Sequence, residues 1–427
     1  MKNSQNIASV VKSGLCTGCG TCIGMCSPNA IELTIDWNKG IYLPQLDEEK
    51  CNHCGVCLEV CPGHSVDFKQ LNRDIFGREP EDTIMGNYRN CYLGHATDYG
   101  IRYNAASGGL VTALLVHALE EGLIAGALVT RMNRDRPLEP EPFIARTRDE
   151  IISAARSKYC PVPVNIALRP ILKEEGRFAV VGLPCHLHGV RKAEVMDKAL
   201  KRKIVLHLGL LCAHFDSFLE TEYVLKKHGI KREDVVELHY RGRGWPGSMQ
   251  VRLSSGTTHL IPFDDYINLH ALHFFAPQRC HSCVDQISSL GDITFMDAWL
   301  PEVMAQDKIG TSIIISRTPV SEALCHSAGL KLVAELEPIT PDRVLKSQGK
   351  AVLAHKDVRA NFFFLRLAGG AIPEYGATFP RSGWFNYLRA ALGQFNTWVS
   401  ARVHLRRLIA PLLRLEVWFF RRLKSTM

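Results

Sequence analysis

Hydrophobic and polar residues alternate near the N-terminus in the way that a β-strand requires. Isoleucine and leucine occupy every second position from 31 to 35, and Asn38-Lys39-Gly40 then forms a turn-like stretch. The alternation resumes at Ile41 and Leu43. Because successive side chains of a strand point to opposite faces, this spacing predicts a short β-hairpin with one apolar face.

Beyond residue 90 the pattern changes to short apolar runs separated by helical stretches. Strand-like runs occur at Ala127–Thr130, Phe178–Gly182, Ile204–Leu211 and Thr311–Ser316, and the run Leu110–Leu119 has the length of a helix. Strands that alternate with helices predict a layered body in which a sheet is covered by helices. The expected fold class is therefore α+β (mixed α/β), with a ferredoxin-like module before this body and a helical tail after it.

The last 47 residues show apolar residues at three- or four-residue spacing with arginines between them, which is typical of basic amphipathic helices. We expect a break at Pro411. The apolar positions are Trp384, Phe385, Leu388, Leu392, Phe395, Trp398, Val399, Val403, Leu405, Leu408, Ile409, Leu412, Leu413, Leu415, Trp418, Phe419 and Phe420. Three roles remain open for this segment: a hairpin packed on the body, a contact with an anionic membrane surface, and a docking site for a partner.

The net charge of +8 comes from this tail and not from the rest of the protein. Residues 381–427 carry nine lysines and arginines against Glu416 alone, so the other 380 residues are neutral overall. The basic balance therefore gives no reason to expect a nucleic-acid partner for the main body.

Length and composition predict several domains. A chain of 427 residues with 46% hydrophobic residues is long enough for two or three. We expect a ferredoxin-type domain at 1–70, a connector at 71–90, a body at 91–380 and the tail at 381–427.

The sequence has neither an apolar stretch of signal-peptide length at its start nor a run of about 18 apolar residues, so we expect a cytoplasmic protein. The basic tail leaves open a peripheral contact at the inner face of the membrane.

Eight of the fifteen cysteines form two copies of the pattern C-x2-C-x2-C-x3-C, and the second copy follows the first by 35 residues. Three thiolates at this spacing reach one cubane iron–sulfur cluster, while the fourth cysteine ligates the other cluster. We assign the first set (Cys16, Cys19, Cys22, Cys61) and the second set (Cys51, Cys54, Cys57, Cys26) to two 4Fe–4S clusters. The alternatives are zinc sites, which usually take cysteine pairs with a longer gap, and disulfides, which need an oxidising compartment.

Four further cysteines form a candidate third set: Cys185, Cys212, Cys280 and Cys283. The last two make a C-x2-C pair, whereas the first two end strand-like runs. Spacing alone leaves open a zinc site, or a purely structural role for the two single cysteines. We expect Cys91, Cys160 and Cys325 to be mostly structural.

Two glycine-rich stretches are candidate cofactor contacts. The segment Ser107-Gly108-Gly109 precedes a helix, where backbone N–H groups favour an anion, although Ser107 as a simple N-cap is the more ordinary interpretation. The loop Arg241–Gly247 (RGRGWPG) offers two guanidinium groups for phosphate and Trp245 for stacking on a ring, whereas its alternative is a solvated basic turn. No GxGxxG motif follows a strand, so a Rossmann site is not supported.

Polar residues near the third set have less specific roles. We expect His186 and His188 to pack, although they could carry protons. Asp292 and Asp297 either orient a cofactor or cap a strand end.

Six motifs together resemble the coenzyme F420 hydrogenase/dehydrogenase beta-subunit family over roughly residues 88–300. They are CYLGHATDYGIRYNAASGGLVTALL, SKYCPV, GLPCHLHGVRK, LLCAHF, YRGRGWPG and RCHSCVDQ with GDITFMDAW. The resemblance implies that the body divides into an N-terminal part at about 91–170 and a C-terminal part at about 171–340. It implies FAD and a 4Fe–4S cluster in the body, with the third set as ligands of that cluster. It also implies a flavin site that includes Ser107, Gly108, Gly109, Lys158, Arg241, Arg243, Gly244, Trp245 and Gly247.

A function follows from these cofactors. Flavin can take two electrons from a hydride donor and release them one at a time to clusters. The family resemblance therefore implies an oxidoreductase that connects coenzyme F420, as a two-electron carrier, with one-electron carriers such as ferredoxin. The alternatives are an electron-transfer subunit without its own substrate and a ferredoxin-dependent reductase, since a related branch reduces a hydroxymethyl chlorophyll. The residues identify no catalytic group, organic substrate or direction of electron flow.

Overall fold

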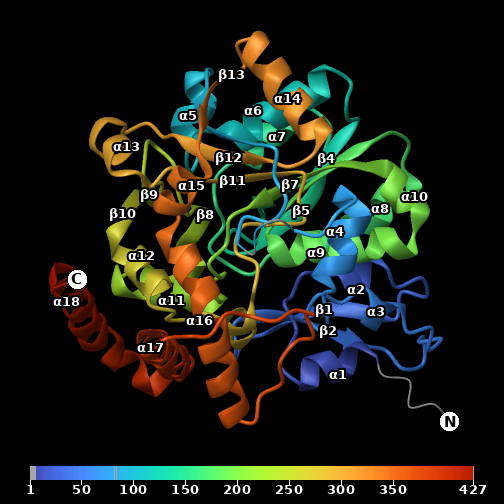
Figure 1. Cartoon of the computed structure of the whole chain (residues 1–427). Helices are drawn as coiled ribbons and strands as arrows, with labels where there is room; N and C mark the ends of the chain where they lie inside the picture. Colours follow the sequence, from blue (N-terminus) through green and yellow to red (C-terminus); the bar gives the residue numbers. More distant parts are fainter. Residues whose placement is uncertain (1–5, 81, 83, 427) are drawn as a thin grey trace.

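The computed structural model describes residues 6–80, 82 and 84–426 (Figure 1). Residues 1–5, 81, 83 and 427, which fall in the predicted ferredoxin segment, connector and tail, lie outside the described residues. The N-terminal unit contains α1 (Ile7–Lys12), α2 (Thr21–Gly24), β1 (Ile31–Asp36), β2 (Ile41–Leu46) and α3 (Val56–Glu59). Strands β1 and β2 pair antiparallel around the turn at residues 37–40, which confirms the predicted hairpin.

An eight-stranded mixed sheet forms the centre of the body, in the order β13-β3-β12-β11-β7-β6-β4-β5. The four strands β11, β7, β6 and β4 are parallel, and the strands outside them pair antiparallel. The strands are β3 (Asn90–Ala96), β4 (Gly126–Met132), β5 (Pro140–Ala145), β6 (Phe178–Gly182), β7 (Ile204–Leu210), β11 (Ile293–Asp297), β12 (Ser312–Ser316) and β13 (Ala334–Ile339).

Helices cover both faces of this sheet, because apolar side chains of its central strands point both ways. Ala127 and Val129 pack on one face with Leu114 of α6, whereas Leu128 packs on the other face with Val190 of α9. The first face carries α5 (Tyr99–Asn104), α6 (Leu110–Glu120), α7 (Arg148–Ser153) and α14 (Pro319–Leu330). The second carries α8 (Leu168–Lys173), α9 (Pro184–Met196), α10 (Lys198–Lys203), α13 (Pro301–Gln306) and α15 (Pro341–Ser347). This layered body confirms the predicted mixed α/β fold.

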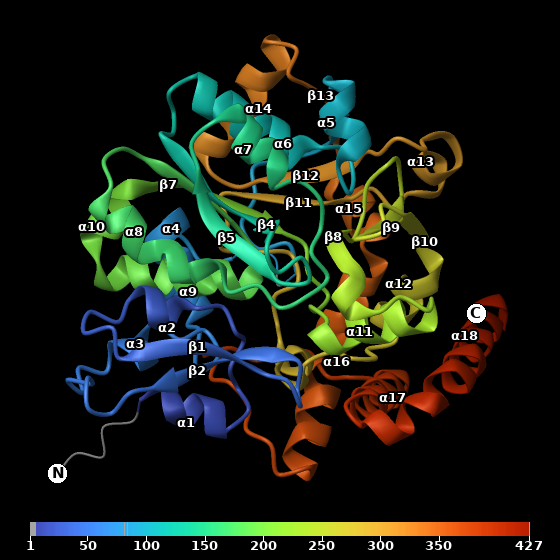
Figure 2. The same cartoon turned by 180° about the vertical axis from the view of Figure 1, so that it is seen from behind.

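A smaller antiparallel sheet lies beside the body and shares a core with two helices (Figure 2). It has the strand order β10-β9-β8. Its elements are β8 (Val235–His239), β9 (Ser248–Leu253), β10 (Thr258–Pro262), α11 (Phe218–Lys227) and α12 (Asp264–Ala271). The hairpin of the N-terminal unit contacts the same core, since Gly40 accepts a hydrogen bond from the Phe218 N–H at 2.8 Å.

The N-terminal unit is docked on α9 through unusually close backbone contacts. A Cβ atom placed on Gly189 of α9 would lie 2.1 Å from the Thr21 hydroxyl, and one on Gly24 would lie 2.2 Å from the Asn165 carbonyl oxygen. Asn165 also donates to the Thr21 hydroxyl at 2.8 Å, and its N–H donates to the Cys19 carbonyl at 2.9 Å. A side chain at either position would collide with these oxygen atoms. Glycine at 189 and 24 therefore allows the N-terminal unit to lie this close to the body.

The predicted connector is partly helical. Helix α4 (Phe68–Phe76) begins before residue 71 and occupies the start of that segment, with Asp67 as its N-cap and Gly77 as its C-cap. The Asp67 carboxylate accepts from the Gln70 N–H at 3.0 Å. Polar composition concealed this helix because only a narrow apolar stripe, which includes Leu71, is buried.

The tail folds as helices on the side of the smaller sheet (Figure 1, Figure 2). Helix α16 (Gly349–Leu367) packs against α17 (Trp384–Ser400), and α18 (Ile409–Thr426) follows a 3-10 turn at Val403–Leu408. The expected break at Pro411 is wrong, because the interruption precedes α18. Pro411 lies in the first turn of α18, where its missing N–H would have no partner in any case. Among the described residues, no helix is both long and apolar enough to span a bilayer.

Candidate iron–sulfur and cofactor sites

The first set of cysteines lines one cavity between α2 and the start of the segment after α3. Its members are Cys16, Cys19, Cys22 and Cys61, together with Gly18, Gly20 and Pro62 among their neighbours. The Gly18 N–H points to the Cys16 sulfur at 3.4 Å. Burial is the main cause that raises the pKa of Cys16 to about 12 and of Cys61 to about 11. Four thiols facing one cavity, three of them buried, suit a cationic cluster, which stabilises their thiolates.

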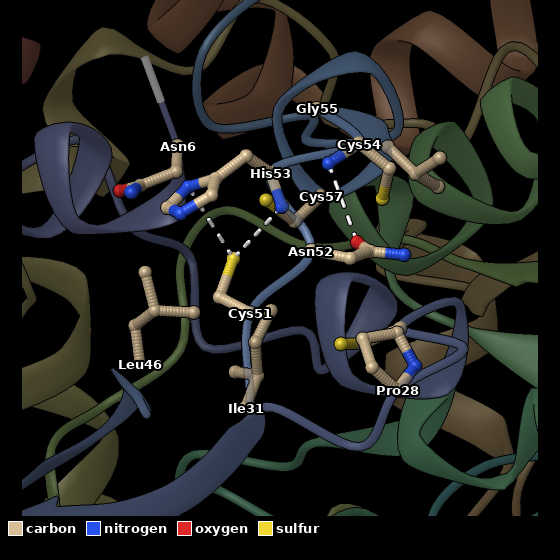
Figure 3. Close-up of a pocket in the computed structure, with 12 residues that line it drawn as sticks. Asn6, Pro28, Ile31, Leu46, Cys51, Asn52, His53, Cys54, Gly55 and Cys57 are labelled. Carbon is tan, nitrogen blue, oxygen red and sulfur yellow. Dashed lines mark hydrogen bonds between the residues drawn. The ribbon is translucent and has the colours of Figure 1, made fainter. Parts of the chain in front are cut away.

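The second set lines a separate cavity near the protein surface (Figure 3). Its members are Cys26, Cys51, Cys54 and Cys57. The His53 N–H donates to the Cys51 sulfur at 3.4 Å, and the Ala30 N–H donates to the Cys26 sulfur at 3.3 Å. Cys54 is exposed, whereas the first set is mostly buried. In both cavities the fourth cysteine comes from the other repeat, as the spacing predicts.

The third set also comes together, from four separate points of the chain. Cys185 lies in the first turn of α9, Cys212 follows β7, Cys280 lies in a 3-10 turn at Gln278–Ser282, and Cys283 ends that turn. Burial, followed by the nearby thiols of the other three, raises the pKa of Cys212 well above its usual value. Their mutual electrostatic influence places the four thiols in one neighbourhood, which fits a metal centre better than isolated structural cysteines.

The first and third sets are neighbours. After burial, Cys19 of the first set is the next largest cause that raises the pKa of Cys185. Between the sets lies Arg279, whose guanidinium donates to the Pro62 carbonyl at 3.2 Å and to the Ser282 hydroxyl at 3.1 Å. Burial raises the pKa of thiols on both sides, including Cys16 and Cys283, and the charge of Arg279 partly opposes this rise. The three cysteine sets therefore follow one another, with the second set near the surface, the first set beside the third, and the third set in the body.

A second cation stands beside the first set. The Lys192 ammonium group of α9 donates to the Cys61 carbonyl at 3.0 Å and to the Ser65 carbonyl at 2.6 Å. Neither Arg279 nor Lys192 stood out in the sequence as a functional residue. The signal for Arg279 was its position directly before the Cys280–Cys283 pair, whereas Lys192 lies on α9 with no motif of its own.

The loop Arg241–Gly247 is held by side chains that the sequence assigned to the flavin. The buried Arg241 forms an ion pair with Asp297 at 2.8 Å, and the Trp245 indole donates to the same carboxylate at 3.2 Å. Trp245 also packs on Trp299, with ring centroids 4.7 Å apart, and is 5% exposed. These two side chains shape the loop and leave little surface for a ligand. Asp297 therefore positions this loop from the end of β11.

Arg243 differs from its neighbours because it is exposed and has a left-handed backbone with φ of 60°. It lies close to Arg156, whose guanidinium donates to the Asn104 carbonyl at 3.0 Å. Burial, and after it the charge of Arg243, lower the pKa of Arg156 although Glu237 opposes them. Two like charges brought together in this way would gain from an anion between them.

The Ser107-Gly108-Gly109 segment serves packing as well as helix initiation. The ordinary interpretation of Ser107 as an N-cap is wrong, because Gly109 is the N-cap of α6 and Ser107 donates to the Thr311 carbonyl at 2.8 Å. The Gly108 N–H donates to the Ser312 hydroxyl at 2.8 Å, and a Cβ on Gly108 would meet the Gly94 carbonyl oxygen at 2.7 Å. The Ser107 hydroxyl is engaged by Thr311 and Ser312, which lie 204 and 205 residues later in the chain. The local sequence around Ser107 could not predict this contact.

Lys158 is half-buried, and its ammonium group donates to three backbone carbonyls at residues 154–156. Burial of the ammonium group lowers its pKa to about 7. The side chain therefore satisfies carbonyl groups of the C-cap residue Ala154 and of the loop that follows helix α7. Its proximity to Arg156 keeps it beside the candidate anion site, but its own donors are already used.

The remaining candidates are mostly structural. His186 accepts the Leu183 N–H at 3.0 Å, and His188 pairs with Asp285 at 2.8 Å. Asp292 joins a buried network in which it contacts Arg191 at 3.1 Å and His207 at 2.8 Å. Cys91, Cys160 and Cys325 are buried in apolar cores.

Two cysteine-lined cavities and a third group of cysteines on a layered α/β body are features of an iron–sulfur protein of the oxidoreductase class. Sequence comparison assigns the family. The models for the N-terminal and C-terminal parts of the coenzyme F420 hydrogenase/dehydrogenase beta subunit match residues 91–169 and 175–342, and a 4Fe–4S dicluster domain matches residues 15–65. The chain belongs to the coenzyme F420 hydrogenase/dehydrogenase beta-subunit family and carries an N-terminal 4Fe–4S domain.

The similar proteins carry names that indicate different partners or substrates. The beta subunit of coenzyme F420 hydrogenase from Methanosarcina barkeri is 28% identical over 270 residues, which cover 61% of this chain and 85% of that protein. A coenzyme F420-dependent sulfite reductase from Methanocaldococcus jannaschii is 29% identical over 357 residues, which cover 79% of this chain and 50% of that protein. A chain of the F420-reducing NiFe hydrogenase complex of Methanosarcina barkeri has the same fold, with a TM-score of 0.55, 24% identity, and coverage of 70% of this chain and 99% of that chain.

Proposed function

We propose that this chain passes electrons between a two-electron carrier of the coenzyme F420 type and one-electron carriers, through FAD and three 4Fe–4S clusters. The observation that carries the proposal is the row of three cysteine sets. The proximity of Cys19 to Cys185, whose pKa it helps to raise after burial, supports transfer from the N-terminal module into the body. The exposed Cys54 supports an exchange of single electrons with a carrier at the surface.

FAD, when bound, supplies the step between two-electron and one-electron chemistry. The residues around Arg243 fit its diphosphate, because Arg243 and Arg156 bring two cations together beside a glycine-rich loop. Arg241 has one guanidinium nitrogen, Nη2, without a hydrogen-bond partner although it is buried. We assign Arg156 and Arg243 to hold phosphate oxygens, and Arg241, Trp245 and Asp297 to hold the loop in place.

Replacing Arg243 with alanine is expected to weaken FAD binding without unfolding the protein. The loss of one charged hydrogen-bond donor to phosphate costs about 1.5–3 kcal/mol, which corresponds to roughly ten- to hundredfold in the dissociation constant. Flavin retained after gel filtration and fluorescence titration of the apoprotein measure the effect. Arg136→Ala is the matched control, because it also removes an exposed arginine. Arg136 forms an ion pair with Glu139. If both variants bound FAD with equal affinity, the diphosphate site would have to lie elsewhere in the protein.

The carrier is tested by anaerobic reduction of the purified chain, followed at the flavin and cluster absorption bands. Under the proposal, reduced coenzyme F420 bleaches the flavin band first and the cluster band afterwards, with no second protein added. Bleaching by reduced ferredoxin alone would favour a ferredoxin-dependent reductase of an organic substrate. If neither donor acts until a partner subunit is supplied, the chain is an electron-transfer subunit without its own substrate.

We also propose that the tail binds an anionic membrane surface. Large apolar side chains on α17 and α18 are exposed, including Trp384 at 73%, Leu415 at 59% and Trp418 at 51%. Arg402 lies over the Trp398 ring at 4.0 Å and Arg422 over the Trp418 ring at 4.6 Å. Tryptophan, leucine and arginine on one pair of helices suit the boundary between lipid headgroups and acyl chains. The inner side of α17 packs on the body, which supports a peripheral contact by its outer side.

A double variant, Leu415→Ser with Trp418→Ser, is expected to lower binding to anionic vesicles by at least about tenfold, since each side chain loses up to about 1.5–3 kcal/mol of apolar burial. Co-sedimentation at low salt measures the effect, and binding of the parent protein should weaken as salt rises. A cut after residue 380 is less suitable, because it also removes α17, whose Thr397 hydroxyl donates to the His273 carbonyl at 2.9 Å.

The control for this experiment is Leu330→Ser with Leu332→Ser, which changes two equally exposed leucines around the end of α14. This control should sediment like the parent. If the parent protein itself ignores anionic vesicles at low salt, the tail is a packed helical pair or a partner-docking site and the membrane proposal fails.

A further inference from the structure

Two histidines and an aspartate form a buried cluster that lies outside the three cysteine sets. His214 and Asp216 belong to the segment after β7, and His270 belongs to α12. One ligand atom from each of the three lies within 4.8 Å of the others. His270 Nδ1 is 2.8 Å from one Asp216 oxygen, and His214 Nε2 is 3.2 Å from the other. The two imidazoles are stacked with centroids 4.0 Å apart, so both rings present a nitrogen to the same carboxylate.

The polar atoms of this cluster are not satisfied by the protein. Neither ring nitrogen of His214 has a hydrogen-bond partner, because the approach of Nε2 to Asp216 lacks hydrogen-bond alignment. One oxygen of Asp216 and one of the nearby Glu220 are also unpartnered. The His214 side chain is 2% exposed and that of Asp216 is not exposed at all. Buried groups without partners cost free energy that a ligand between them would recover.

The cluster also lacks positive charge. Two carboxyl groups, Asp216 and Glu220, lie together in the interior, and their described neighbours are imidazoles. Within the described residues no lysine or arginine forms an ion pair with either carboxyl. A buried carboxylate normally pairs with a cation or binds a metal ion. The cluster therefore has no permanent cation among the described side chains, and only protonation of an imidazole would supply positive charge from them.

We propose that His214, Asp216 and His270 bind one divalent transition-metal ion, of the zinc or ferrous type, in a site distinct from the iron–sulfur clusters. Two imidazole nitrogens and a carboxylate are a common ligand set for these ions. Ligand atoms bound at about 2.0–2.1 Å to one ion lie about 3 Å from each other. Each imidazole nitrogen lies at such a distance from one of the two Asp216 oxygens, 2.8 Å for His270 and 3.2 Å for His214, so the carboxylate would bind the ion through both oxygens. Glu220 lies near Asp216 in the same buried cluster.

The position of this site connects two parts of the molecule. His214 follows Cys212 by two residues, and His270 lies against Tyr159, with ring centroids 5.7 Å apart. Tyr159 in turn accepts a hydrogen bond from Arg241, at the base of the loop assigned to FAD. The ion would lie between the third set and that loop. Three protein ligands leave a coordination position for water or for a substrate oxygen, and the 15% exposed His270 marks the open side.

Metal content of the full-length protein, purified anaerobically with its clusters, tests the proposal. We expect about one zinc, manganese or cobalt ion, or one iron ion beyond cluster iron, per chain, and about one Co²⁺ taken up when the protein is treated with that ion. The bound Co²⁺ should show ligand-field bands of nitrogen and oxygen ligands. A sulfur-to-cobalt charge-transfer band would instead place the metal at cysteines and overturn the proposal.

Variants identify the ligands. Asp216→Asn and His270→Gln should each reduce Co²⁺ uptake at least tenfold while cluster iron and acid-labile sulfide stay at the parent level. His404→Ala, which removes an exposed histidine of the tail, should leave uptake unchanged. The proposal is wrong if both ligand variants bind Co²⁺ as the parent does, or if the parent binds none. The spectrum of the parent decides the question even where a variant fails to fold.

Discussion

A Cys280→Ser variant is expected to hold about eight iron atoms per chain after anaerobic reconstitution, where the parent protein holds about twelve. The hydroxyl of serine is a poor substitute for a buried thiolate, and the third set has no spare cysteine nearby. The two N-terminal cavities share no ligand with this set, so their clusters should persist. Iron and sulfide analysis, together with the electron paramagnetic resonance of the reduced protein, measures the loss.

Cys325→Ser is the matched control for this experiment. Cys325 is also buried, at 2% exposed, but it packs in an apolar core far from the three sets. The Cys325→Ser protein should retain as much iron as the parent protein. A Cys280→Ser protein with undiminished iron would exclude a cluster at the third set. Loss of all twelve atoms would instead mean that the body cluster is required for the N-terminal module to dock.

Replacement of Asp292 with alanine is expected to lower the free energy of unfolding by about 3–5 kcal/mol, because it leaves buried charge without a partner. Asp292 contacts Arg191 at 3.1 Å and His207 at 2.8 Å, and His207 also contacts Glu194 at 2.6 Å. These four side chains join α9, β7 and the start of β11 in the interior. Urea unfolding followed by far-ultraviolet circular dichroism measures the change. Glu121→Ala, which breaks an exposed ion pair with Lys331, should cost at most about 1 kcal/mol.

The same network gives a pH dependence whose sign follows from its pKa shifts. Burial and Arg191 lower the pKa of His207, but Glu194 and Asp292 outweigh them and raise it. The contribution of His207 to the free energy of unfolding is therefore fully present below pH 6.5, and it is lost as the pH rises through the pKa of His207 in the folded protein. Burial opposes ionisation of Asp292 and Glu194, but Arg191 and His207 lower the pKa of both. Their contribution is lost as pH falls below about 4. The difference between parent and Asp292→Ala should be largest between about pH 4.5 and 6.5. A flat difference across pH 4–8 would contradict this account.

Residue spacing predicted those parts of the structure that depend on local geometry. The alternation at 31–43 predicted the hairpin, and the apolar runs at 178–182 and 204–211 predicted two neighbouring strands of the central sheet. The fixed period of the cysteine repeats also determined which cysteines could face one cavity. In these cases the neighbours in space are also neighbours in a repeating pattern, so one sequence carries the information.

Contacts between distant segments could not be predicted in the same way. Arg241 and Trp245 looked available for a ligand, but both bind Asp297, which lies more than 50 residues later in the chain. Ser107 looked like an N-cap, but its hydroxyl donates to the carbonyl of Thr311, directly before β12. The cluster of His214, Asp216 and His270 gave no signal, because its third member comes from a helix that packs on the loop only in the folded protein.

The close contact between Gly189 and Thr21 has a consequence for the speed of electron flow. Thr21 lies beside Cys19, with their side-chain oxygen and sulfur 3.2 Å apart, and Gly189 lies one turn along α9 from Cys185. The missing methyl group at Gly189 would thus set how near the two proposed clusters, of the first and third sets, can come. Since electron tunnelling slows steeply with distance, the rate of transfer along the proposed route would depend on a residue that binds no cofactor and takes part in no reaction.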